Sequence, residues 1–141
     1  MNNANMFKLF LRKRSRQAGD VAAESIATHQ LGMIAQQQRC LAAAEQCYRK
    51  SLAISEKQGN EHGAASTYGQ LGILAWRQND YEEAGEWLVR SVKSFAACND
   101  SHYAAQGARH FAVLYQQADA NTQAKLAAIW QDADLGEVPQ P

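Results

Sequence analysis

The stretch from Gln70 to Ala84 constrains the fold more than any other part of this 141-residue chain, because weaker copies of it lie forty positions before and after it. Its Leu71-Gly72 pair recurs as Leu31-Gly32 and, more loosely, as Phe111-Ala112. A chain that repeats a short unit at fixed spacing buries its apolar side chains by stacking the units on one another. The sequence therefore predicts an array of three repeats.

Composition predicts that the repeats are helical. The two prolines are both among the last three residues, so the chain before them is free to form helices. Alanine and glutamine are abundant, and runs rich in valine, isoleucine and threonine, which favour strands, are missing. We expect an all-α fold.

Each repeat begins with a residue that can cap a helix. Asp20, Asn60 and Asp100 fall at equivalent positions, and their side chains can accept hydrogen bonds from free N–H groups at a helix start. Apolar or small residues at helical spacing follow each cap, which predicts one buried face for each first helix. These series are Ala27, Leu31, Ile34 and Ala35, then Thr67, Leu71, Leu74 and Ala75, then Gly107, Phe111, Leu114 and Tyr115.

A second helix is expected in each repeat after a short turn. Asn79 and Asp119 are its capping candidates, and Glu82 completes a capping box with Asn79. Gly and Asn residues between repeats favour the left-handed backbone that ends a helix. Six helices are predicted, near residues 20–37, 40–57, 61–77, 80–97, 101–117 and 120–133. The repeats then span 20–59, 60–99 and 100–133, with a basic and apolar segment at 1–19 and a flexible acidic tail at 134–141.

The chain resembles the tetratricopeptide repeat family, whose pattern is W-x2-L-G-x2-Y…A-x3-F…P. The Leu-Gly pairs match it, as do Ala44, Ala84 and Ala124 as small second-helix residues and Tyr48 as the aromatic. The forty-residue period and the missing proline depart from the usual 34-residue repeat and resemble longer-repeat members such as kinesin light chain and bacterial regulators. HEAT repeats share the period, but the Leu-Gly and alanine spacing favours the tetratricopeptide interpretation. The resemblance implies a right-handed α-solenoid.

The resemblance also implies a concave groove lined by the first helices, which would bind a protein or peptide partner. An alternative is that the apolar members only pack between helices and that Trp76 covers a repeat junction. Met33, Ile73 and Val113 in the stripe argue against capture of a peptide carboxylate by Lys and Asn, as in chaperone-binding members. The groove positions are His29, Met33, Gln36, Gln37, Gly69, Ile73, Trp76, Arg77, Arg109, Val113, Gln116 and Gln117.

No catalytic or metal constellation is expected. The four histidines are His29, His62, His102 and His110, and no two of them suggest a metal pair. Three cysteines without a CxxC pair indicate neither a disulfide framework nor a zinc site and fit a reducing cytoplasm. We expect a cytoplasmic protein that is not an enzyme and has no cofactor.

The charge distribution is uneven although the formal net charge is zero. The first sixteen residues carry five cations and no acid, and the remainder carries nine basic and fourteen acidic residues. This segment, which also contains MFKLFL, is interpreted as a helix packed on the domain or on a second chain, as a disordered tail, or as a contact with an anionic membrane. Nucleic acid is not expected, because no aromatic residues alternate with the cations and the rest of the chain is acidic.

The last helix suggests self-association. Leu126, Ile129 and Trp130 replace mostly polar residues of the earlier repeats, whereas a terminal repeat needs a polar outer face. Two functions follow from the sequence. One is a scaffold that binds a segment in its groove. The other is a homo-oligomeric structural or membrane-proximal assembly factor that uses its terminal helices and its basic N-terminus.

Overall fold

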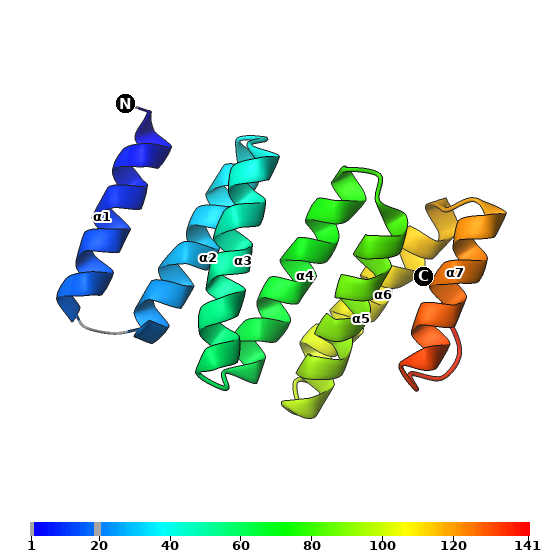
Figure 1. The fold of residues 1–141 in the computed structure, drawn as a ribbon. Coiled ribbons are helices and arrows are strands. Elements are labelled where there is room, and N and C mark those ends of the chain that lie inside the picture. The colour runs from blue at the N-terminus through cyan, green and yellow to red at the C-terminus, as the bar shows by residue number, and fades with distance from the viewer. Residues whose placement is uncertain (1, 19–20) are drawn as a thin grey trace. The chain divides into compact units, whose positions relative to one another are not determined.

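The computed structural model describes residues 2–18 and 21–141, without the side chains of residues 14–18. The described residues form seven α-helices and no strand, so the all-α prediction is confirmed (Figure 1). The helices are α1 (Asn3–Ala18), α2 (Val21–Gln37), α3 (Leu41–Lys57), α4 (Glu61–Arg77), α5 (Tyr81–Ala97), α6 (Ser101–Gln117) and α7 (Ala120–Asp132). The six repeat helices were predicted to within one residue at each end, and the proposed cap Asp20 lies outside the described residues.

A three-residue turn joins each successive pair of helices from α2 to α6. Arg39, Gly59, Asn79 and Asn99 each have a φ near +60° in these turns. At the α4–α5 turn, the Asp80 N–H donates to the Ala75 carbonyl at 2.9 Å, which is the bond pattern of a left-handed helix end. Helices of 17 residues and turns of three make a twenty-residue spacing inside the forty-residue repeat.

In the α3–α4, α4–α5 and α5–α6 turns, the residue after the left-handed one caps the following helix. Asn60, Asp80 and Asp100 accept hydrogen bonds from the backbone N–H three residues later. The prediction that Asn79 caps α5 is therefore wrong. Asn79 provides the left-handed conformation, and Asp80 provides the cap.

The chain divides into two compact units, with the boundary between Thr67 and Tyr68 of α4; unit 1 comprises the described residues up to Thr67, and unit 2 comprises residues 68–141. Unit 1 holds α1, α2, α3 and the start of α4. In it, α2 and α3 approach closely where Gly32 faces Tyr48, because a Cβ at Gly32 would lie 2.6 Å from Tyr48 Cδ1. Buried Ser25 and Ser51 bind each other's carbonyl groups through their hydroxyls at 3.0 and 2.8 Å. Small residues therefore permit close packing of these helices, as predicted.

Unit 2 has an apolar core built from α4, α5, α6 and α7. Its members are Ala75, Ala84, Leu88, Val89, Val92, Phe111, Leu114, Leu126 and Trp130. A Cβ at Gly72 would lie 2.9 Å from Leu88 Cγ, so the second Leu-Gly pair has the same role as the first.

Helix α7 departs from the repeat. Its connection to α6 has no left-handed residue, since Ala118 and Asp119 are extended, and the helix begins one residue early relative to the twenty-residue spacing. Leu126 is fully buried against Gly85, and the Trp130 ring packs 4.7 Å from that of Phe111.

Two predictions about α7 are therefore wrong. Leu126 and Trp130 do not form an apolar outer face, because the shifted helix turns them into the core of unit 2, and Ile129 packs partly against the same core. Ala124 is exposed and so does not serve as the small contact residue. Leu135 and Val138 of the tail, which we expected to be flexible, also pack against this core.

Candidate protein-binding surface

Eight of the twelve predicted groove residues lie within unit 2, on α4 and α6. Ile73 and Trp76 are half-buried on α4, and the Trp76 indole Nε1 donates a hydrogen bond to Gln117 Oε1 on α6 at 3.1 Å. This bond joins the two first helices and fixes the indole beside the core that it partly covers. We call the set Ile73, Trp76, Arg77, Arg109, Val113 and Gln116 the α4–α6 surface.

The exposed members of this surface are mainly cationic and polar. Arg77, Arg109 and Gln116 are exposed, and Val113 is 36% exposed. His110 next to Arg109 is half-buried, and its burial together with the Arg109 charge lowers the pKa of its imidazole. His110 is thus neutral at pH 7, and the positive charge of the α4–α6 surface comes from the two arginines.

Three predicted groove residues have other roles. Gln36 is buried and accepts a hydrogen bond from the Tyr48 hydroxyl at 2.7 Å, so it is a core residue. Gly69 faces α5, because a Cβ there would lie 3.2 Å from Ser91 Oγ. These two assignments to an open groove are wrong.

His29 is the third. It is half-buried, its Nδ1 lies 3.0 Å from Thr67 Oγ1, and burial lowers the pKa of its imidazole. His29 therefore joins α2 to α4 within unit 1. The two remaining groove residues, Met33 and Gln37, are exposed on α2.

The sequence reasoning missed an aromatic and cationic cluster on α4 and α5. The Arg90 guanidinium lies 4.5 Å from the Tyr68 ring centre and 5.0 Å from that of Trp87, and the two rings stack at 5.8 Å. Such contacts stabilise the packing of an exposed arginine. The spacing of Trp87 and Arg90 on one helix face was the available signal, but neither residue recurs in the other repeats.

The described residues hold no group of three or more His, Cys, Asp and Glu side chains that could bind a metal ion. Among these residues, none of the helices has the length and hydrophobicity that crossing a bilayer requires.

Comparison with known protein families decides the assignment. The model of the tetratricopeptide repeat family matches residues 24–97, which is more than half of the chain. The chain belongs to the tetratricopeptide repeat family. Tetratricopeptide repeats generally mediate protein–protein interactions and are generally not catalytic. A search of the curated proteins found no match for this tetratricopeptide repeat protein.

Proposed function

We propose that this tetratricopeptide repeat protein is an adaptor that binds a peptide or protein segment on the α4–α6 surface. The observation that carries the proposal is the Trp76–Gln117 hydrogen bond, which holds a half-buried indole between two first helices. Tryptophan and arginine dominate the binding energy of many protein interfaces, especially where the indole is held in place beforehand.

The chemistry of the surface defines the segment that fits it. Ile73, Trp76 and Val113 offer apolar area, and Arg77 and Arg109 add two positive charges. None of the six residues is acidic. A segment with an aromatic or aliphatic side chain flanked by carboxylates is therefore complementary, because guanidinium groups bind carboxylates in a forked geometry.

Selection of peptides from a random displayed library on the full chain tests the proposal. The selected sequences should be enriched in Asp or Glu next to a large apolar residue. Their affinity, measured by fluorescence polarisation, should fall about tenfold or more for Arg77→Gln and for Val113→Gln, since truncating central interface residues typically costs over 1 kcal/mol. Lys93→Gln, an exposed charge on α5, is the matched control and should bind like the wild type.

Equal affinity of Arg77→Gln, Val113→Gln and wild type would remove the α4–α6 surface from the proposal. The alternative of a homo-oligomer formed through the last helix has lost its basis, because Leu126 and Trp130 are buried within unit 2.

A further inference from the structure

Helix α1 exposes large apolar side chains on one side. Met6, Leu9 and Phe10 are 58%, 56% and 58% exposed. Their spacing of three and four residues places them on one face of the helix. Single exposed apolar residues are ordinary on a protein surface, but three on one face form a patch that indicates a binding partner.

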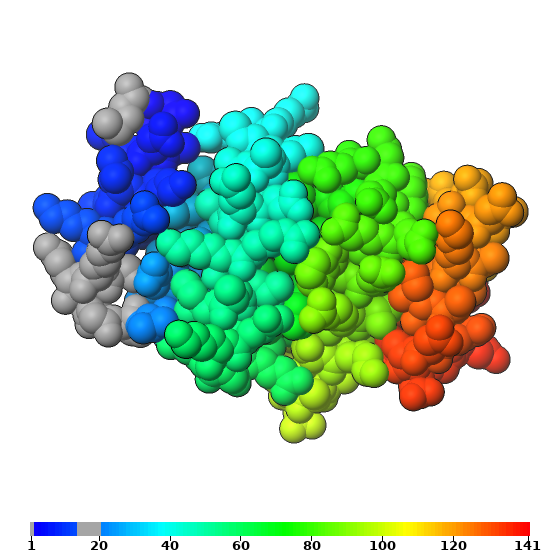
Figure 2. Space-filling model, viewed as in Figure 1, coloured from blue at the N-terminus to red at the C-terminus, as the bar shows by residue number. Residues whose placement is uncertain are grey.

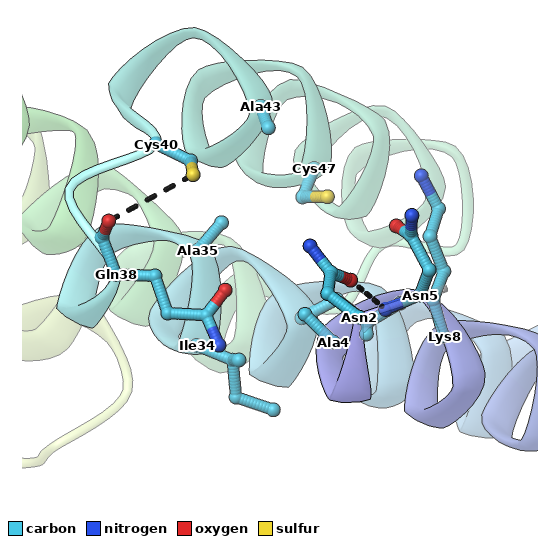
Figure 3. A pocket seen from close by; sticks show the side chains of 11 residues that line it. Asn2, Ala4, Asn5, Lys8, Ile34, Ala35, Gln38, Cys40, Ala43 and Cys47 are labelled. Carbon is cyan, nitrogen blue, oxygen red and sulfur yellow. Dashed lines mark hydrogen bonds between the residues drawn. The ribbon is translucent and has the colours of Figure 1, made fainter.

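The inward side of α1 is fixed by its contacts within unit 1. Ala4 and Lys8 line a small pocket of about 100 Å³ together with residues of α2 and α3, including Ile34 and Cys47 (Figure 3). Leu11 is partly buried, one helical heptad after Ala4. In Figure 2 the atoms of α1 form the outer edge of unit 1. Met6, Leu9 and Phe10 are therefore on the side of α1 that faces away from α2.

The charged side chains on and after this patch of α1 are all positive. Arg12 and Lys13 are exposed on α1, and Lys13 follows Leu9 by one helical turn on the patch face. The sequence has no acidic residue before Asp20. An amphipathic helix with apolar and cationic residues but no acid is complementary to an anionic bilayer surface.

A second copy of the chain fits the apolar patch of α1 less well than an anionic bilayer does. Met6, Phe7, Leu9 and Phe10 are each about half exposed, which amounts to roughly 400 Å² of apolar area on one copy. A stable homodimer interface buries about 800 Å² from each partner, of which roughly 500 Å² is apolar, so this patch alone falls short of it. Pairing two α1 helices would also bring their like charges together.

We propose that α1 binds the surface of an anionic lipid bilayer. Met6, Leu9 and Phe10 enter the boundary between headgroups and acyl chains, and Arg12 and Lys13 contact the lipid phosphates. Lys13 reaches the phosphates by extending its aliphatic stem along the apolar face. The α4–α6 surface takes no part in this contact, so the two proposals stand independently.

Sedimentation of the full chain with sucrose-loaded vesicles tests this proposal. Vesicles of phosphatidylcholine with about a third phosphatidylserine are compared with pure phosphatidylcholine, at low and at physiological salt. The chain should bind the anionic vesicles, more strongly at low salt, and should bind pure phosphatidylcholine weakly, because surface charges are screened by salt.

Two variants separate the apolar and the charged contributions. Met6→Gln/Phe10→Gln keeps every charge and should weaken binding about tenfold or more, because binding strength follows the apolar area buried. Arg12→Gln/Lys13→Gln keeps the apolar patch and should weaken binding to anionic vesicles about thirtyfold, since each cation near the surface contributes roughly a factor of five. Val113→Gln, on the α4–α6 surface, is the control and should bind vesicles like the wild type.

Circular dichroism establishes that each variant keeps the wild-type helix content. Absence of binding to anionic vesicles at low salt would overturn the proposal, and so would equal binding to both kinds of vesicle. A dimer in equilibrium sedimentation that Met6→Gln/Phe10→Gln abolishes would also overturn it and would assign the patch to a second copy.

Discussion

At the residue scale, the contact between Gly32 and Tyr48 explains why a glycine follows Leu31. The fully buried Tyr48 ring lies so close to Gly32 that the Cβ atom of any larger residue there would be 2.6 Å from Tyr48 Cδ1. Gly72 and Leu88 repeat this contact in unit 2. The Leu-Gly pairs of the sequence are thus a packing requirement of the helical hairpin.

We predict that Gly32→Ala destabilises the protein by about 1–2 kcal/mol. The added methyl group overpacks the core against Tyr48, which costs about 1–3 kcal/mol, and the better helix propensity of alanine returns at most about 1 kcal/mol. The midpoint of urea unfolding measures the change. Met33→Ala, the exposed neighbour on α2, is the control and should stay within about 0.5 kcal/mol of the wild type. A Gly32→Ala variant as stable as the wild type would contradict the packing described for Tyr48.

The residues that line the surface were predicted only in part from the sequence. Repeat equivalence assumes that Gln36, Trp76 and Gln116 have the same environment, which holds only if their neighbours also correspond. The buried Tyr48 hydroxyl needs a hydrogen-bond acceptor. Gln36 provides that acceptor and is therefore buried as well. In the second repeat, Leu88 stands at the position of Tyr48 and has no hydroxyl. Trp76, at the position of Gln36, donates its hydrogen bond to Gln117 instead.

At the element scale, the ends of the helices were the most predictable feature and the register of the last helix was the least. Caps and left-handed residues are local signals, readable from a few neighbouring residues. The shift of α7 depends on the tertiary fit of Leu126 against Gly85, which no repeat pattern in the sequence encodes.

Cys40 differs from the equivalent residues of the next three turns because its side chain does not cap the following helix. It occupies the cap position of α3 with a backbone like that of Asp80, but its side chain makes no capping hydrogen bond. We predict that Cys40→Asp stabilises the protein by about 1 kcal/mol, because the carboxylate satisfies a free N–H and interacts well with the helix dipole. The reverse change, Asp80→Cys, should cost a similar amount, and both are measured by urea unfolding. If Asp80→Cys destabilises and Cys40→Asp changes nothing, the α2–α3 turn differs from its copies.

At the scale of the whole molecule, each unit holds one histidine that burial keeps neutral. Burial lowers the pKa of His29 in unit 1, and burial with the Arg109 charge lowers the pKa of His110 in unit 2. The unfolded chain therefore binds protons near pH 6.5 that the folded chain does not bind. The stabilisation that the neutral forms of His29 and His110 contribute is fully present above this pH. It decreases as the pH falls below it.

We predict that the free energy of unfolding falls between pH 7.5 and pH 5.5, and that His29→Gln reduces this fall. Urea unfolding at several pH values measures both effects. Gln30→Ala, at an exposed position next to His29 on α2, is the control and should follow the wild-type pH dependence. Parallel pH profiles for the wild type and His29→Gln would show that His29 is not the group responsible.

The regular turns determine where the gene of such a protein can be lengthened. Residues 41–80 begin just after one cap residue and end on the next equivalent one, so a tandem duplication of them would keep both helix ends intact. The extended connection at Ala118-Asp119 has no counterpart elsewhere among the repeat turns that the structure describes, so a duplication ending there would join mismatched ends.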